Sequence, residues 1–418
     1  DMFIGREKEL QSLQEFYNKD GCGMMVIYGR RRIGKSTLIT EFIKQKKVIF
    51  YTATKVGKEM LLSVLQKYMD TSWKDTNIKI ILCGSALSFM ENKVLSEKSP
   101  LFGRRDSQIK LEPFDYLDAA KFVPEYCARD KAVCYGITGG VAKYLSMIDP
   151  CKSLDENIVR LFFKTDGYLY DETRNLLTQE FSDISLVNNI IEQIAYGKNT
   201  VNEIATKLGE TSPAVLYSLE KLINIGLVQK RKCITEEKNK KKTQYVLKDF
   251  MFKFWYEFIP KATSVIEIGQ GEMYYNKVVK PELHSFMGAV FEEMCRYYTL
   301  KEGVLEKFGC FITNVGVWWG TESITNAEGK KCSQSADIDV VGLSEPEKKV
   351  VLGECKFKNE KIDKKVYETL IRRGNQIKLK YHIEKYVLFS MSGFTEWFDS
   401  LEDNNVVLLT LEDLYQNS

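Results

Sequence analysis

Short apolar runs alternate with helical patterns along the first quarter of the chain. Apolar runs at 24–28, 47–53 and 78–83 predict three strands. A helical pattern at Leu38–Ile43 follows the first run, and the segment MLLSVLQKYMD lies between the second and the third. Strands that alternate with helices are typical of a parallel sheet, so this region is predicted to fold as an α/β domain.

The middle of the chain is predicted to be helical, with one hairpin. Residues 112–185 carry mainly helical patterns. Three further helices are predicted at Leu186–Ala195, at Thr200–Gly209 and from Ser212 onward, with Ser212 as an N-cap. Two short strands, Leu227–Lys232 and Thr243–Leu247, then form a hairpin. Three helices and a hairpin are the elements of a winged helix.

Two properties of this region concern its partners. Residues 230–242 carry seven lysines and arginines against two glutamates, which suits contact with DNA phosphates. The alternative is a solvated hairpin tip on a module that docks proteins. The aromatic helix Asp249–Phe258 is predicted to pack against its neighbours rather than to stack on bases, and the stretch 260–280 is predicted to be a linker.

Composition limits the class of protein. A chain of 418 residues should hold two to four domains, and 44% hydrophobic with 28% charged residues is ordinary for soluble globular protein. A net charge of +3 means that any nucleic-acid surface must be local. The ten cysteines show no paired spacing, which predicts reduced thiols in the cytoplasm, and no apolar run is long enough to span a membrane. Two histidines, His284 and His382, argue against a zinc site.

The strongest motif follows the first predicted strand. Residues 29–36, GRRRIGKS, fit G-x-x-x-x-G-K-[ST], the P-loop that holds nucleotide phosphates. Gly29 and Gly34 allow the backbone N–H groups to approach phosphate, and Lys35 would reach the β- and γ-phosphates of ATP. Ser36 would supply a ligand to Mg²⁺, with Thr37 beside it.

The three arginines between the glycines are less specific. Arg30, Arg31 and Arg32 are expected to be solvated loop residues; contact with phosphate or with a neighbouring domain is the alternative.

Several further segments resemble AAA-like and STAND-type ATPases of the archaeal kind. These are FIGRE at 3–7, CGS at 83–85 and TGGVAKY at 138–144, in which Ala142 stands where the family has proline. The resemblance implies that Ser85 is the small polar sensor near the γ-phosphate; a strand-end residue or helix cap is the alternative. The resemblance also suggests that Arg104 senses the nucleotide, either within the chain or across a subunit boundary of a homo-oligomer. The alternative is that Arg104 and Arg105 are a basic pair on the surface.

One expected part of such an ATPase is missing. A Walker B strand ending in Asp-Glu should lie between the strands at 47–53 and 78–83, but only about 24 residues separate them, against roughly 40 for a helix–strand–helix crossover. Either the protein has lost this element, or a segment of the natural chain is missing around Lys58–Met60. The absence leaves ATP binding predicted and ATP hydrolysis open.

A second group of candidate residues lies near the C-terminus. Two strands, 336–343 and 349–357, are predicted to form a hairpin around Glu345-Pro346, which sets Asp339 and Glu354 at similar height and puts Lys356 on the face of Glu354. This pattern resembles the PD-(D/E)XK nuclease fold, in which such an Asp and Glu hold Mg²⁺ and the Lys assists attack on phosphate. By the same resemblance, Glu292 of the preceding helix adds an acid, with Glu293 as the weaker choice. Arg372, Arg373 and Gln376 of the helix at 367–380 would meet phosphates.

The expected architecture is therefore a multidomain α/β protein. Its parts are a P-loop ATPase core at 1–111, a helical lid at 112–185, a winged helix at 186–260, a linker at 261–284 and a nuclease-like domain at 285–418. The family resemblance implies an ATP- and Mg²⁺-binding ATPase that binds DNA and cleaves or grips it. A nucleotide-dependent switch that binds protein partners, with an inactive nuclease-like domain, is the alternative.

Overall fold

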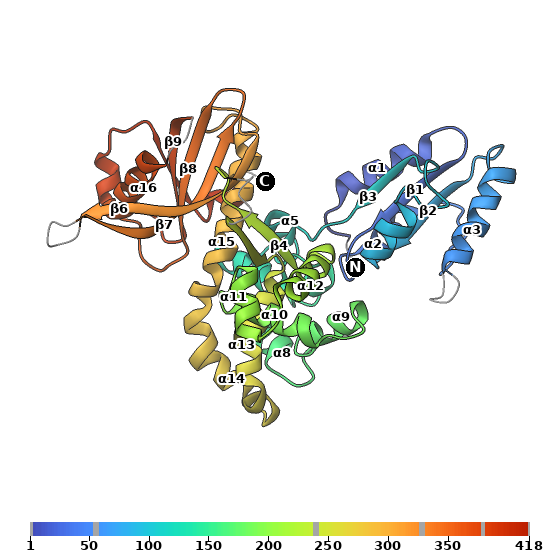
Figure 1. The fold of residues 1–418 in the computed structure, drawn as a ribbon, viewed down its shortest axis with the longest axis horizontal. Helices are drawn as coiled ribbons and strands as arrows, with labels where there is room; N and C mark the ends of the chain where they lie inside the picture. Colours follow the sequence, from blue (N-terminus) through green and yellow to red (C-terminus); the bar gives the residue numbers. More distant parts are fainter. Residues whose placement is uncertain (1–2, 53–57, 237–241, 326–330, 378–380, 417–418) are drawn as a thin grey trace.

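The protein has three parts arranged along its longest axis (Figure 1). A small α/β lobe lies at one end, a helical region in the middle and a five-stranded sheet at the other end. This computed structural model describes residues 3–52, 58–236, 242–325, 331–377 and 381–416. Within these ranges, every helix is too short or too polar to cross a membrane.

The N-terminal lobe is built on three parallel strands in the order β2-β1-β3. These are β1 (Gly23–Tyr28), β2 (Lys79–Gly84) and β3 (Ser107–Lys110). Every residue of β1 is buried, as expected for the central strand of a covered parallel sheet. The helical segments of the lobe are α1 (Glu7–Asn18), α2 (Lys35–Ile43), α3 (Lys58–Tyr68), η1 (Met69–Trp73), α4 (Leu87–Phe89) and η2 (Met90–Val94).

The strand predicted at 47–53 does not form in its described part. Residues 47–52 have no regular secondary structure, and the side chains of Val48 to Tyr51 are 49–98% exposed. The prediction was wrong because an apolar run becomes a strand only beside a partner. The outer edge of β2 has no neighbouring strand among the described residues.

The middle region is helical, with the hairpin as predicted. The first helices are α5 (Tyr116–Ala120), α6 (Ala128–Thr138), α7 (Ala142–Leu145), α8 (Leu154–Phe162) and α9 (Glu172–Glu180). The next are α10 (Ser185–Ala195), α11 (Val201–Leu208) and α12 (Ser212–Asn224), followed by the antiparallel pair β4 (Val228–Lys232) and β5 (Thr243–Leu247). Thr211, and not Ser212, is the N-cap of α12. Part of the basic hairpin tip, 237–241, lies outside the described residues.

The predicted linker is instead largely helical, with a short turn at 268–270. The aromatic helix α13 runs from Phe250 to Glu267, followed by α14 (Gly271–Tyr274), η4 (Tyr275–Val279) and α15 (Lys280–Gly303). Six residues of its aromatic half are buried, so it packs into the core as predicted. Pro260 sits inside α13. A proline inside a helix costs about 3 kcal/mol. We infer that the burial of Ala262 and Ile266, which lie beyond Pro260, offsets this cost and maintains the helix.

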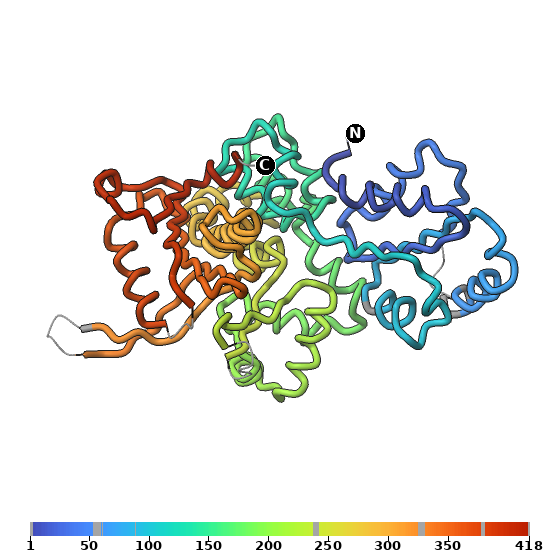
Figure 2. Tube along the Cα trace, turned by 90° about the horizontal axis from the view of Figure 1, so that it is seen from above, coloured from blue at the N-terminus to red at the C-terminus, as the bar shows by residue number. Residues whose placement is uncertain are grey.

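The C-terminal part is one mixed sheet in the order β10-β9-β8-β7-β6. Its strands are β6 (Asn314–Thr325), β7 (Lys331–Ser344), β8 (Lys349–Lys356), β9 (His382–Ser390) and β10 (Val406–Thr410). The helical segments are α16 (Lys364–Gln376), η5 (Glu396–Ser400) and α17 (Asp413–Gln416). Helix α15 runs from the middle region to this sheet (Figure 1), and in the view of Figure 2 it is seen nearly end-on beside the sheet.

Candidate functional site

The P-loop has the backbone that its glycines predict. Gly29 has φ 149°, and a Cβ there would lie 2.4 Å from the carbonyl oxygen of Leu111, so only glycine fits. Gly34 has φ 90° and precedes the first residue of α2, Lys35. The loop thus joins the C-terminal end of β1 to a helix N-terminus, where N–H groups and the helix dipole favour anions.

Lys35 is held inside the loop. Its ammonium nitrogen donates to the carbonyl oxygens of Gly29, at 2.8 Å, and Arg30, at 2.6 Å. An ammonium group has three N–H donors, so one remains for a phosphate oxygen. The residue is only 7% exposed, and this burial lowers the pKa of Lys35 to about 8.

The other predicted nucleotide residues divide into two groups. Ser36 and Thr37 are exposed in the first turn of α2, and Ser85 follows the C-terminal end of β2, at the sheet edge that carries the loop. Ser85 does not cap α4, whose N-cap is Ala86. Arg104 precedes β3 and therefore lies at the opposite edge, where it pairs with Asp70 at 2.8 Å. This placement favours the surface-pair alternative over a role for Arg104 at the nucleotide of its own chain.

The expectation that the loop arginines are solvated was wrong. Each of the three pairs with a carboxylate of the middle region, and the partners are Asp249, Glu180 and Glu172 for Arg30, Arg31 and Arg32, respectively. These acids lie far from the loop in sequence, and no local pattern linked them to it. Only Asp249 had a recognisable signal, its position as N-cap of the aromatic helix.

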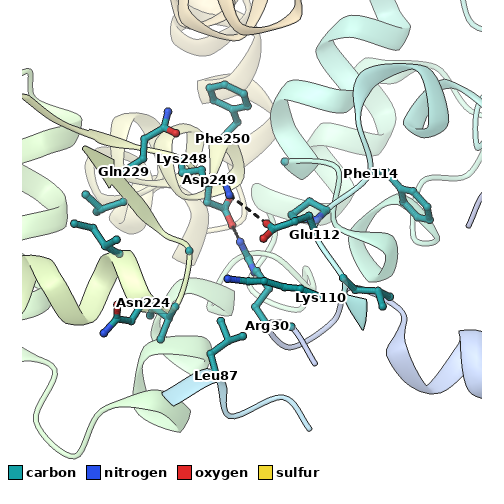
Figure 3. Close-up of a pocket in the computed structure, with 18 of the residues that line it drawn as sticks. Arg30, Leu87, Lys110, Glu112, Phe114, Asn224, Gln229, Lys248, Asp249 and Phe250 are labelled. Carbon is teal, nitrogen blue, oxygen red and sulfur yellow. Dashed lines mark hydrogen bonds and ion pairs between the residues drawn. The ribbon is translucent and has the colours of Figure 1, made fainter. Parts of the chain in front are cut away.

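A cavity of about 430 Å³ lies beside the loop, at the junction of the N-terminal lobe and the middle region (Figure 3). Gly29 and Arg30 form part of its wall, but Lys35 and Ser36 do not line it. Across the cavity the two regions are joined by the Arg30–Asp249 pair and by Lys248, which contacts Glu112 at 3.1 Å. The P-loop is thus in direct contact with the start of α13.

The C-terminal carboxylates lie where the hairpin symmetry predicted. Val340 pairs with Gly353, so Asp339 and Glu354 are the next positions along β7 and β8. Asp339 accepts a hydrogen bond from the backbone N–H of Cys355 at 2.9 Å. Burial, with the negative charges of Glu354 and Glu292, holds the pKa of Asp339 well above its ordinary value. The three predicted acids are therefore close enough to interact.

Each of these acids has a nearby cation. Lys356 lies 2.6 Å from Glu354, and Arg296 contacts Glu292 at 3.5 Å, Glu293 at 2.9 Å and the carbonyl oxygen of Asp339 at 2.8 Å. The described residues contain no group of three or more metal-ligating side chains arranged to hold an ion. In this arrangement Glu354 and Glu292 are paired with Lys356 and Arg296, respectively, rather than open to an ion.

The helix predicted to meet phosphates contacts the sheet instead. Arg372 and Arg373 of α16 pair with Glu322 of β6, a residue that is 1% exposed and that the sequence analysis missed. Arg373 also contacts Asp337 at 3.2 Å, and Gln376 bonds the backbone of Ser323. These side chains are occupied within the protein.

The hairpin of the middle region is joined to the same sheet. Ile234, just after β4, donates its backbone N–H to the carbonyl oxygen of Val317 in β6 at 2.9 Å, and its side chain packs in the core of the C-terminal part. Burial and the charge of Arg296 lower the pKa of Arg231 in β4, while Glu292, Glu293 and Asp339 oppose this shift. The hairpin therefore lies against the acidic cluster.

Comparison with known proteins identifies the N-terminal segment. Residues 3–56 match an ATPase domain found predominantly in Archaea, and residues 255–370 match a family described as "Archaea bacterial proteins of unknown function". An uncharacterized ATP-binding protein of Methanocaldococcus jannaschii is 40% identical over 47 residues, which cover 11% of this chain and 80% of that protein.

Longer alignments exist at lower similarity. An uncharacterized protein of the same organism is 26% identical over 462 aligned residues, covering 99% of this chain and 100% of that protein. The alignment exceeds the 418 residues of this chain by 44, so at least 44 residues of that relative have no counterpart here. A solved STAND protein with a tetratricopeptide repeat sensor from Pyrococcus horikoshii is 15% identical. It aligns with 74% of this chain and 51% of its own, and its TM-score of 0.24 is too low to support an argument. Residues 3–56 are thus similar to the ATPase domain found predominantly in Archaea, and these matches support an ATP-binding function of the ATPase type.

Proposed function

We propose that the chain is a nucleotide-controlled switch that holds ATP with Mg²⁺ in its P-loop and passes the nucleotide state to the middle region. The position of Lys35 carries this proposal. Its ammonium group is buried at the loop carbonyls with one donor left for phosphate. Ser36, exposed in the first turn of α2, has the hydroxyl that would hold Mg²⁺, and the ion would screen phosphate charge.

Binding is better supported than turnover. Hydrolysis needs an acid near the γ-phosphate to orient water, and among the described residues no strand that ends in such an acid lies beside β2. We therefore assign ATP binding, and not hydrolysis, to the described residues.

The test is calorimetric titration of ATP with Mg²⁺ into the full chain and two lysine variants. Lys35→Ala is expected to abolish binding. Lys44→Ala removes a lysine at the other end of α2, where the side chain is 60% exposed, and is expected to bind as the wild type does. Equal affinity of Lys35→Ala and wild type would reject the site.

A second candidate function is favoured by the geometry of Asp339, Glu354 and Lys356. Their juxtaposition supports a nuclease-like C-terminal domain that contacts DNA together with the basic hairpin. Because Lys356 pairs with Glu354 and Arg296 with Glu292, we favour gripping over cutting. If the domain binds protein partners instead, DNA affinity at low salt will be absent; if it binds DNA, the affinity will fall steeply with salt.

Cleavage is tested separately. Supercoiled DNA is incubated with Mg²⁺, with and without ATP, using wild type, Glu354→Gln and the control Glu360→Gln, an exposed residue after β8. Nicking that is lost only in Glu354→Gln would establish the nuclease. Nicking that survives in Glu354→Gln would reject the assigned residues.

A further inference from the structure

The three loop arginines connect the P-loop to two helices of the middle region. Arg30 lies 2.5 Å from Asp249, which caps α13. Arg31 lies 3.1 Å from Glu180 at the end of α9. Arg32 lies 2.6 Å from Glu172 at the start of the same helix. We call these three ion pairs the loop latch.

Helix α9 is held at both ends. Glu172 and Glu180 are eight residues apart, about 12 Å along a helix, so α9 lies across the loop that would receive phosphate. The backbone of the loop makes a further contact with the middle region. The N–H of Lys143 in α7 donates a hydrogen bond to the carbonyl oxygen of Arg32 at 3.0 Å. A movement of the loop arginines cannot leave α9 unaffected.

Stability alone does not account for the latch. Glu172 is 1% exposed, Asp249 is 3% exposed and Arg30 is 8% exposed. Burying such charges costs about as much as their attraction returns. Arg30 also keeps two buried N–H groups, on Nε and Nη2, without a hydrogen-bond partner. Three carboxylates thus balance three guanidinium groups beside a phosphate site. One of the guanidinium groups, that of Arg30, lacks some of its hydrogen-bond partners.

We propose that the carboxylates of the loop latch and the phosphates of a bound nucleotide compete for the loop arginines, so that nucleotide binding loosens α9 and α13 from the loop. This inference rests on the proposed ATP site and adds its regulation. Phosphate brings the negative charge that the carboxylates now supply, and guanidinium binds both in the same bidentate manner. Because coupling between two equilibria is reciprocal, weakening the latch raises nucleotide affinity.

Arg31–Glu180 is the pair best suited to exchange. It is the most accessible of the three, with side chains 33% and 12% exposed, and Glu180 is at the end of its helix. Glu172 is less suitable as a test because it also accepts a hydrogen bond from buried Tyr144, at 2.6 Å. Asp249 accepts one from the backbone of Phe252 as the cap of α13.

The experiment compares two variants that break the same ion pair. Titration of ATP with Mg²⁺ is measured for wild type, Glu180→Gln, Arg31→Gln and the control Glu210→Gln, an exposed residue between α11 and α12. Competition predicts that Glu180→Gln binds ATP roughly 5-fold more tightly or better, and that Arg31→Gln binds more weakly than wild type. Glu210→Gln should match wild type. Equal shifts of the two variants in the same direction would overturn the inference, because a merely structural pair does not distinguish them.

A second readout follows the helix itself. Saturating ATP is expected to speed backbone hydrogen exchange in residues 172–180 of the wild type, and to have little further effect in Glu180→Gln. Unchanged exchange there, with unchanged affinity of Glu180→Gln, would also reject the latch. Failure of the ATP site has a different signature, which is equal binding by Lys35→Ala and wild type, or no binding by either.

Discussion

ATP affinity should fall as the pH rises above about 8. The reason is the buried ammonium group of Lys35, whose pKa of about 8 lies below the ordinary value of 10.5. Only the protonated lysine attracts phosphate. A bound polyphosphate places negative charge beside the ammonium group and returns its pKa toward the ordinary value. The complex therefore binds one more proton than the free protein between these two pKa values.

The size of the effect follows from these two values. At pH 9.5 a free lysine of pKa 8 is about 3% protonated, while one of pKa 10.5 is about 90% protonated, so affinity should be roughly 30-fold weaker than at pH 7. The nearby thiol of Cys83 contributes little below pH 9, because burial raises its pKa above 9.0. Phosphate groups of ATP have lost their last proton well below pH 8.

Titration calorimetry at five pH values from 7 to 9.5, in buffers of different ionisation enthalpy, measures both affinity and proton uptake. Uptake of nearly one proton near pH 9 is expected. Affinity that stays constant over this range, with no proton uptake, would refute the argument that Lys35 meets the phosphates as a buried ammonium group.

Three further predictions follow from single contacts. Gly140→Ala should destabilise the fold by about 2 kcal/mol or more in urea unfolding, because a Cβ would lie 2.0 Å from the carbonyl oxygen of Phe114 at φ +68°; wild-type stability would contradict this. Ile234→Ala should cost about 2–4 kcal/mol and speed hydrogen exchange around Val317, and unchanged exchange would show that the hairpin does not depend on this contact. Arg104→Ala should leave ATP affinity of the isolated chain within about twofold, since this residue lies at the far edge of the sheet; a large loss would place it at the nucleotide after all.

Local patterns predicted the elements better than the contacts between them. Two predictions depend on residues close in sequence: the strand–loop–helix around Lys35, and the placement of Asp339 and Glu354 at similar height on adjacent strands. The structure contains both features. The partners of the loop arginines are distant, with Glu180 lying 149 positions from Arg31. No periodicity encodes such a pair, so surface solvation was the natural but wrong expectation.

Two other errors have the same physical origin. The irregular stretch 260–280 suggested a linker, but tertiary packing of the residues beyond Pro260 maintained the helix to Glu267. The apolar run at Val48–Tyr51 suggested a strand, but a strand requires a neighbour for its backbone groups. In both places the deciding interactions come from elements elsewhere in the fold.

The exposed run at Val48–Tyr51 and the outer edge of β2 point to the same missing neighbour. A further parallel strand beside β2 would pair with that edge and bring its carboxyl end to the sheet edge that carries Lys35. That is where an acid that orients water for hydrolysis has to lie. A relative with at least 44 residues that this chain lacks has enough length for a helix and such a strand. We therefore predict that the natural protein carries an internal segment between residues 52 and 60 that ends a strand in acidic residues. Peptide mapping of the protein from its own host decides the matter, because a peptide that runs without interruption from Thr52 to Met60 would refute the prediction.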